Sequence, residues 1–420
     1  MRLNSKWNRR SFLGSVGMIA SSILAPCKLF SWSRGAASAS TPVSGFGHTG
    51  NPYEELGVTT VINCEGTMTM LGGSLPHPEL EAVMTMAGRH FVSIPELEVA
   101  AGKRIAEMLK LPEGYTALVT SGAAAAIQSG LAGILTGGKE ALILQLPDLT
   151  GMKSEVIIQK SHRNPFDHQL RSTGVKLIEI ETVDQLRAAV NERTAMMHFT
   201  NFANAAGQIK VDDWVKLAKQ YNLPCMNDAA ADTPPVSHLW DYTNMGYDLV
   251  TFSGGKAIRG PQCAGLLIGR KDMVANALLN NSPHEDTLGR SQKVGKEEIL
   301  GMVKALELFL AEDHDALSKE WQDRLEGISR ELKKVPGVST SFFLPDIANH
   351  VPHMSITWDA ARISLTPQQA SKLLRISKPS IVMGGGEGRP GLAMNSFMLQ
   401  PGEDKIVAEQ LSRLLREHAA

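Results

Sequence analysis

Short apolar runs alternate with amphipathic segments along most of the chain from about residue 95 onward. Each apolar run has the length of a buried strand, and many of the intervening segments have the spacing of a helix that covers a sheet. This alternation predicts an α/β fold with a large, doubly wound and mostly parallel sheet. The predicted strands are 116–120, 141–145, 155–159, 176–180, 195–200, 224–228, 248–252 and 264–268, with helices such as 123–135 and 211–221 between them.

The pattern outside this region predicts further segments. The C-terminal part holds three short predicted strands and two predicted helices, at about 366–376 and 402–417, which are enough for a small α/β domain. A stretch rich in Gly, Ser and Pro is typical of a linker. The predicted division is a linker at 40–52, an N-terminal segment at 53–94, a large cofactor-binding domain at 95–294, a connecting helix at 295–334 and a small domain at 335–420.

Residues 1–39 have the features of an export signal. Arg9 and Arg10 end a basic stretch, and the apolar stretch at 11–25 is shorter than the roughly 20 residues that a membrane-spanning helix needs. Residues 37–39 (Ala-Ser-Ala) supply a small-x-small cleavage site. The order Arg-Arg-Ser-Phe-Leu resembles the twin-arginine signal. We therefore expect the twin-arginine (Tat) translocon as a partner during export, a periplasmic or otherwise exported protein and no stable membrane anchor, with a cytoplasmic location as the alternative.

Composition and charge exclude several classes of protein. The 420 residues are 43% hydrophobic and 20% charged, which is ordinary for a globular protein. The formal net charge of −1 is an average, because residues 1–39 hold six basic and no acidic residues and the rest of the chain carries −7. An acidic chain is unlike a general nucleic-acid binder. The four cysteines form no Cys-x-x-Cys pair, so we predict neither a metal site nor a disulfide framework.

Three segments with chemically suitable residues follow predicted strands. Ser121, Gly122 and Ala123 open a helix, where backbone N–H groups favour a phosphate. Asp228 ends a strand, at the usual ligand crevice of an open α/β sheet. Lys256 follows another strand and is flanked by small residues. Each feature alone is ordinary, but together they supply a lysine for a Schiff base, an acid for a pyridine nitrogen and a phosphate site, which is what pyridoxal 5'-phosphate needs.

Several motifs resemble one family. Residues 248–265 (Asp-Leu-Val-Thr-Phe-Ser-Gly-Gly-Lys-Ala-Ile-Arg-Gly-Pro-Gln-Cys-Ala-Gly) resemble the cofactor-lysine motif of the selenocysteine synthase-like family, within the fold-type I pyridoxal-phosphate proteins of the aminotransferase class V grouping. This family includes L-seryl-tRNA(Sec) selenium transferase and the D-glucosaminate-6-phosphate ammonia-lyase type. The resemblance covers about residues 53–417, and its other motifs lie at 56–73, 119–125, 161–168 and 399–403.

The resemblance implies roles for individual residues. Lys256 would form the Schiff base and move the proton at Cα, and Asp228 would pair with the pyridinium nitrogen. His162 would stack on the cofactor ring, with His168 as the competing candidate. The implied cofactor-binding residues are Ser121, Gly122, Ala123, His162, Asp228, Ser253 and Lys256, and the candidates for a substrate carboxylate or phosphate are Arg163, Arg259 and Arg389.

The resemblance also limits the reaction. Gly255 precedes the lysine where the selenium transferase has an acidic residue, and the acidic chain does not favour transfer RNA as a substrate. We therefore expect an enzyme that forms a Schiff base with a small amino acid or amino sugar acid, abstracts the Cα proton, and then eliminates in the manner of an ammonia-lyase or racemises. A selenium-transferase-like enzyme and a cofactor-binding protein without catalysis are the alternatives. The family also implies a homodimer or a higher homo-oligomer, and no nucleic-acid partner is expected.

Overall fold

We describe a computed structural model of the chain, in which residues 50–346, 348, 350–385 and 390–419 are placed. The predicted export signal, residues 40–49 of the predicted linker, and Arg389 lie outside these described residues. The chain divides into two units, residues 1–58 and residues 59–420. In the described part of the first unit, the short helix α2 (Pro52–Glu55) begins at Asn51, whose side chain accepts a hydrogen bond from the Tyr53 N–H at 3.0 Å.

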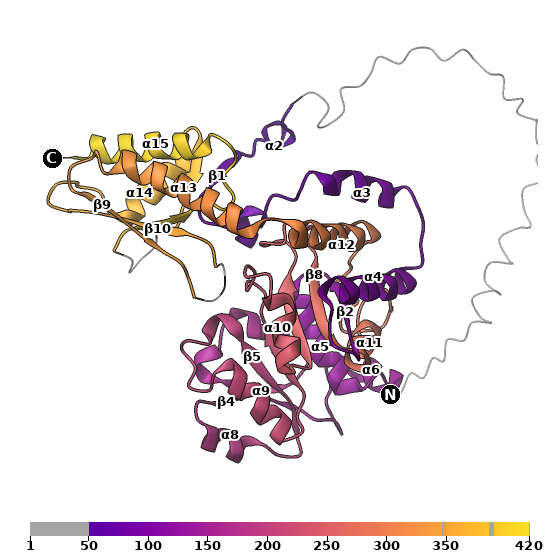
Figure 1. The fold of residues 1–420 in the computed structure, drawn as a ribbon. Coiled ribbons are helices and arrows are strands. Elements are labelled where there is room, and N and C mark those ends of the chain that lie inside the picture. Colours follow the sequence, from indigo (N-terminus) through magenta and orange to yellow (C-terminus); the bar gives the residue numbers. More distant parts are fainter. Residues whose placement is uncertain (1–49, 347, 349, 386–389, 420) are drawn as a thin grey trace, which may run out of the picture. The chain divides into compact units, whose positions relative to one another are not determined.

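A seven-stranded sheet forms the centre of the large domain (Figure 1). Its strand order is β2-β8-β7-β6-β5-β3-β4, and β8 is antiparallel to both of its neighbours while the other pairs are parallel. This order confirms the predicted mostly parallel sheet. The strands are β2 (Tyr115–Thr120), β3 (Glu155–Gln159), β4 (Lys176–Ile180), β5 (Thr194–Thr200), β6 (Cys225–Asp228), β7 (Leu249–Ser253) and β8 (Gly265–Arg270).

Helices cover both faces of this sheet. Successive strand residues point to opposite sides, so a strand that is apolar throughout has to be covered on each side. On β2, Ala117 and Val119 join one hydrophobic core and Leu118 joins the other. Strands β3, β5 and β6 are buried at every position, as expected for parallel strands covered on two faces. The helices are α3 (Glu79–Gly88), α4 (Ile94–Leu109), α5 (Ala123–Thr136), α6 (Glu140–Gln145), α7 (His168–Arg171), α8 (Val183–Ala189), α9 (Val211–Gln220), α10 (His238–Met245) and α11 (Lys271–Leu279), with 3-10 turns η1 (Thr69–Leu71), η2 (Lys160–His162), η3 (Pro165–Asp167) and η4 (Asn201–Ala203).

One predicted strand is wrong. Residues 141–145 lie in the helix α6, where Ile143 is buried and Leu144 is about half exposed. A short apolar run does not distinguish a strand from a helix by its periodicity. The helix forms here because Gly137 and Gly138, both at positive φ, end α5 and turn the chain along the surface.

The predicted connecting helix at 295–334 consists of two helices, α12 (Lys296–Ala311) and α13 (His314–Leu332). The Asp313 side chain caps α13 by accepting a hydrogen bond from the Ala316 N–H at 3.0 Å. Helix α12 packs against α3 and α4, whereas α13 packs against α15 in the C-terminal core. The break between the two helices therefore marks the passage from one core to the other.

The C-terminal part holds four strands in its described residues, one more than expected. Three of them form an antiparallel sheet in the order β12-β10-β9. The remaining strand, β11, pairs in parallel with β1 (Val61–Asn63), so the N-terminal segment contributes to the C-terminal core. The elements are β9 (Val338–Phe343), β10 (His353–Trp358), β11 (Ser380–Val382), β12 (Leu392–Asn395), α14 (Pro367–Ile376) and α15 (Glu403–Glu417).

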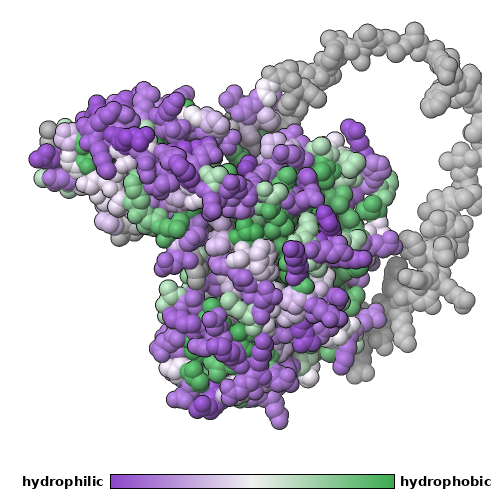
Figure 2. Space-filling view, viewed as in Figure 1, coloured by the Kyte–Doolittle hydropathy of each residue, from purple (hydrophilic) through white to green (hydrophobic). Residues whose placement is uncertain are grey.

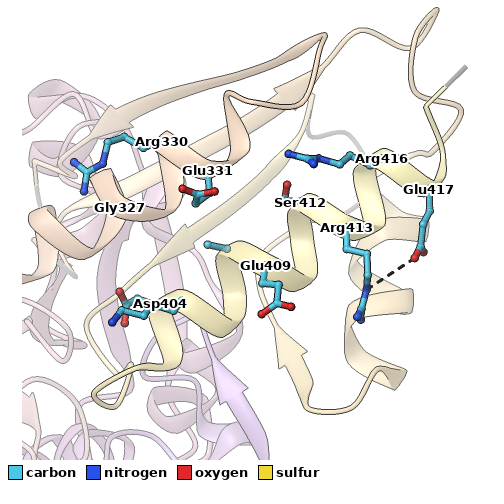
Figure 3. A pocket seen from close by; sticks show the side chains of 11 residues that line it. Gly327, Arg330, Glu331, Asp404, Glu409, Ser412, Arg413, Arg416 and Glu417 are labelled. Carbon is cyan, nitrogen blue, oxygen red and sulfur yellow. Dashed lines mark ion pairs between the residues drawn. The ribbon is translucent and has the colours of Figure 1, made fainter.

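A groove of about 730 Å³ between α13 and α15 is lined mainly by charged side chains (Figure 3). Arg330 and Glu331 lie on one helix, and the ion pair between Arg413 and Glu417 lies on the other. None of the predicted site residues that the structure describes lines this groove. Within the described residues, none of the helices has the length and apolar character needed to cross a membrane.

Candidate active site

The carboxyl ends of three parallel strands bring the predicted acid and lysine to one edge of the sheet. Asp228 ends β6, and the strand register places it between Thr200 on β5 and Thr251 on β7. Lys256 follows the end of β7 at Ser253. Because these strands run parallel, their carboxyl ends meet at the crevice where open α/β sheets bind ligands.

Asp228 is a buried carboxyl group with one oxygen still available. Its Oδ1 accepts hydrogen bonds from the Ala230 N–H at 3.2 Å and from the Thr251 hydroxyl at 3.4 Å. Its Oδ2 makes no hydrogen bond with the described residues. Burial raises the pKa of Asp228, while these hydrogen bonds and the charge on Lys256 act in the opposite direction. A cation placed at Oδ2 would therefore stabilise the ionised form.

Lys256 lines a cavity of about 100 Å³, and it is the only predicted site residue that does so among the residues that the structure describes. Burial lowers the pKa of Lys256, and the charge on Asp228 opposes that shift only in part. A lysine in this state has a larger fraction of neutral amine, which is the form that attacks a carbonyl or accepts a proton. The other walls come from segments far apart in the sequence and include Glu65, Thr67, Thr233, His353, Asn395 and Phe397.

The predicted phosphate loop lies at the junction of β2 and α5. Gly122 stands at φ 86° as the N-terminal cap of α5, and no side chain caps the helix. The N–H groups of the first turn are thus free of a side-chain acceptor and can bind an anion. The register places Thr120, Gly265 and Ser253 in one row across β2, β8 and β7, so Ser253 lies at the same edge. A Cβ atom on Gly265 would lie 2.5 Å from the carbonyl carbon of Gly122, so this approach requires glycine.

His162 lies at the end of β3, fully buried, and its ring makes structural contacts. It packs edge-on against Phe199 with a centroid distance of 4.5 Å. Its Nδ1 accepts a hydrogen bond from the Thr200 N–H at 3.2 Å, and its Nε2 lies 3.1 Å from Nε2 of Gln159. Burial, with a smaller contribution from Lys210, lowers the pKa of His162 to about 4, so the ring is neutral at pH 7. None of these contacts joins His162 to Lys256 or Asp228, and its stacking role stays a prediction.

The competing histidine is also separate from the cavity. His168 begins α7 as an exposed side chain, and its Nδ1 lies 3.3 Å from Nη2 of Arg171.

The two candidate substrate arginines that the structure describes contact other protein groups outside the cavity. Arg163 forms ion pairs with Asp167 (2.5 Å) and with Glu179. Arg259 donates a hydrogen bond from Nε to the carbonyl oxygen of Leu75 at 2.8 Å. Neither side chain lines the Lys256 cavity. Their roles, like that of Arg389, stay predictions.

Two residues of the cavity wall were missed from the sequence. His353 and Asn395 are paired across β10 and β12 in the C-terminal sheet. No local motif marks them, because only the packing of the C-terminal sheet brings them near Lys256.

A buried cluster around Asp232 was also missed. Its Oδ2 accepts hydrogen bonds from the Asn201 side chain and the Tyr242 hydroxyl and lies 3.2 Å from Nδ1 of His238. The next residue, Thr233, lines the cavity. The second aspartate in the run Asp-Ala-Ala-Ala-Asp at 228–232 was the available sequence signal. In the part of the chain that the structure describes, no cluster of three or more His, Cys, Asp or Glu residues could hold a metal ion.

Comparison with known proteins defines the class. Residues 93–288 match the family model described as Aminotransferase class-V. The fold of the chain is that of the fold-type I pyridoxal-phosphate-dependent enzymes. Class V domains and the related proteins depend on pyridoxal phosphate.

Individual relatives are similar over most of the chain. D-glucosaminate-6-phosphate ammonia lyase of Salmonella typhimurium is 27% identical, covering 89% of this chain and all of the relative. A solved structure of D-glucosaminate-6-phosphate ammonia-lyase has a TM-score of 0.76 at 25% identity, covering 88% of this chain and 99% of the other. A 5'-C-glycyluridine monooxygenase-decarboxylase of Streptomyces is 26% identical, over 87% of this chain and 92% of the relative. The L-seryl-tRNA(Sec) selenium transferase of Carboxydothermus hydrogenoformans is 25% identical, covering 85% of this chain and 74% of the relative.

The residues at this edge of the sheet fit pyridoxal phosphate. The uncapped first turn of α5, opened by Gly122, suits the phosphate group. The free Oδ2 of the buried Asp228 suits a pyridinium N–H. Lys256 lines the cavity with a lowered pKa, as a lysine that reacts with an aldehyde requires.

Proposed function

We propose that this protein is a pyridoxal-phosphate-dependent ammonia-lyase that acts on a small amino acid or an amino sugar acid. The observation that carries the proposal is the Lys256 amine, which lines a cavity, has a lowered pKa and interacts electrostatically with the buried carboxyl group of Asp228. The similarity to an ammonia lyase over 89% of the chain supports elimination rather than another fate of the substrate.

Each residue of the site has a definite task in this proposal. When bound, the cofactor supplies an electron-accepting ring that stabilises negative charge at Cα of the substrate. Lys256 Nζ accepts the Cα proton, and its lowered pKa makes the neutral amine available for this step. Asp228 Oδ2 holds a proton at the ring nitrogen. The first turn of α5 and the Ser253 hydroxyl bind the phosphate and fix the position of the ring.

The overall reaction is balanced without an external oxidant or reductant. A 2-amino-3-hydroxy acid loses its Cα proton and its β-hydroxyl group, and hydrolysis then releases ammonia. The water lost in the elimination equals the water used in the hydrolysis. The products are therefore one 2-keto-3-deoxy acid and one ammonia for each substrate molecule.

The cofactor assignment is tested by chemical trapping. Reduction of the purified protein with borohydride is expected to fix the cofactor mass on the peptide that contains Lys256, as read by mass spectrometry. Lys256→Ala should abolish the label and the ammonia release, whereas Lys271→Ala, which removes an exposed lysine at the start of α11, should preserve both. An unlabelled Lys256 peptide would refute the proposal.

The fate of the substrate is tested in deuterium oxide. A lyase is expected to release ammonia and to incorporate one solvent deuterium at C3 of the keto acid. A racemase would instead return amino acid that is deuterated at Cα with scrambled configuration. Absence of deuterium uptake from every amino acid tested would favour a cofactor-binding protein without catalysis.

We further propose that the protein is exported to the periplasm through the twin-arginine pathway with its cofactor in place. The support is the order of basic, apolar and small residues within 1–39, since this pathway carries folded proteins. Replacing Arg9 and Arg10 by lysine should retain the protein in the cytoplasm, as measured by cell fractionation. Unchanged export of that variant would contradict the proposal.

We also propose that two copies of the chain form a dimer through the segment 86–99. This segment exposes Met86, Phe91, Val92 and Val99, and hydrophobic residues gather over the α3 and α12 layer (Figure 2). An exposed apolar patch of this kind is typical of a protein interface. Phe91→Glu should give a monomer in light scattering, whereas Phe166→Glu, at another exposed phenylalanine, should not. A monomeric wild-type protein would refute this proposal.

A further inference from the structure

The Lys256 cavity has one wall residue with an unused hydrogen-bond acceptor. Asn395 is only 3% exposed, and its Oδ1 is buried without a hydrogen-bond partner. Leaving a buried polar atom unpaired costs free energy, so such an atom in a ligand cavity points to a ligand group that pairs with it.

The orientation of the Asn395 amide follows from its neighbours. Its Nδ2 donates to the carbonyl oxygen of Glu65 at 3.1 Å and lies 3.4 Å from Nε2 of His353. Nδ1 of His353 lies 2.7 Å from the carbonyl oxygen of Val351, which can only accept, so Nδ1 carries the ring proton and Nε2 accepts. Burial lowers the pKa of His353 and so favours this neutral ring. Both amide hydrogens of Asn395 are thereby used, and Oδ1 is left to accept a hydrogen bond.

The surrounding backbone holds this amide in place. The Asn395 N–H donates to the carbonyl oxygen of Cys64 at 2.9 Å, which joins β12 to the N-terminal segment. The Asn63 side chain accepts from the N–H groups of Glu65 and Gly66 at 3.0 Å each and so fixes the turn that presents the Glu65 carbonyl. The acceptor is therefore preorganised before any ligand binds.

We infer that Asn395 is a specificity-determining residue whose Oδ1 accepts a hydrogen bond from a hydroxyl group of the substrate, so that the enzyme selects polyhydroxylated amino acids such as amino sugar acids. This inference rests on the proposed function. The amino group of the substrate cannot be the donor, because it reacts at the cofactor. The wall also offers the hydroxyls of Thr67 and Thr233, and Lys256 is the only cationic side chain among the described residues that line the cavity. Such a wall suits hydroxyl groups better than a second carboxylate.

The test compares two ligands of equal chain length on the holoenzyme. Glucosaminate carries four hydroxyl groups, and 2-aminohexanoate carries none on the same six-carbon skeleton. Dissociation constants are measured from the change in cofactor absorbance and, independently, by calorimetry. The wild-type protein is expected to bind glucosaminate at least about 10-fold more tightly, because a site built to bond hydroxyls rejects the analogue that leaves its polar groups unpaired.

The variant isolates the contribution of Oδ1. Asn395→Ala is expected to weaken glucosaminate binding about 10- to 100-fold and to change binding of 2-aminohexanoate by less than about 3-fold. The control Asn244→Ala, at an exposed position on α10, should change neither constant. Equal weakening of both ligands would show a merely structural role and overturn the inference.

The outcomes separate this inference from the proposed function. If borohydride places no cofactor on Lys256, the proposed function fails and the inference fails with it. If Lys256 is labelled and both ligands change the cofactor spectrum, but the wild-type protein binds them with equal affinity, only the inference is overturned. The wild-type comparison does not depend on any variant, so a misfolded Asn395→Ala protein would leave this test intact.

Discussion

Glu98 is a buried carboxyl group whose replacement by glutamine should make stability depend on pH in a predictable way. It lies on α4, is 2% exposed, and its Oε2 accepts a hydrogen bond from the Val119 N–H of the edge strand β2 at 3.1 Å. Burial raises the pKa of Glu98 from an ordinary value of 4.5 to about 8, although the hydrogen bond acts in the opposite direction. Glu98→Gln keeps the shape and an acceptor oxygen but cannot ionise.

The sign and the size of the effect follow from this shift. Between pH 4.5 and about 8 the folded protein keeps the Glu98 proton, while the unfolded chain loses it. The stability of the wild-type protein therefore falls as pH rises through this window and the contribution of Glu98 is constant above it. One pKa unit corresponds to about 1.4 kcal/mol, so the total contribution is of order 5 kcal/mol. Glu98→Gln lacks this loss and should become the more stable protein at high pH.

The assay is urea unfolding, followed by tryptophan fluorescence, at several pH values from 5 to 9. The stability difference between Glu98→Gln and wild type should be small near pH 5 and grow to about 5 kcal/mol at pH 9. Glu107→Gln, which changes an exposed carboxylate on the same helix, should give a difference below about 0.5 kcal/mol throughout. A Glu98→Gln difference that does not change with pH, or a less stable variant at pH 9, would refute the reasoning.

Three further substitutions test the geometry of the site. Gly265→Ala should lower the free energy of unfolding by about 1–3 kcal/mol and weaken cofactor binding at least about 10-fold, because its Cβ would meet the backbone of the phosphate loop. The control Gly327→Ala in α13, where the nearest atom to the new Cβ is 3.8 Å away, should raise the free energy of unfolding by up to about 1 kcal/mol. Equal effects of the two variants, in urea unfolding and in cofactor titration, would contradict this prediction. Asp228→Asn should slow Cα proton exchange at least about 100-fold while the cofactor remains on Lys256, and an unchanged exchange rate by NMR would count against its role. Asp232→Ala leaves buried donors unpaired and should cost about 3 kcal/mol in urea unfolding, with a loss below about 1 kcal/mol as the contrary result.

The strands and the positions of the chemical groups at their ends were predictable because both depend on local order in the chain. The predicted strands from 155–159 to 264–268 agree with β3 to β8 to within two residues at each end. Residues 141–145 were not predictable in this way, since a short surface helix can have the same apolar content as a short strand. The helix that was expected to connect the two domains is interrupted at residues 312–313, because α12 packs into one hydrophobic core and α13 packs into the other.

The sequence by itself determined the class of fold and the pair Asp228 and Lys256, because parallel strands place their carboxyl ends at one edge whatever the details of packing. Only the tertiary structure decided which other side chains meet that pair. It buried His162 against Phe199, paired Arg163 with carboxylates, and brought Asn395 from the C-terminal sheet into the cavity wall. The physical reason is that these contacts join residues distant in the chain, and spacing along a sequence encodes only its local periodicity.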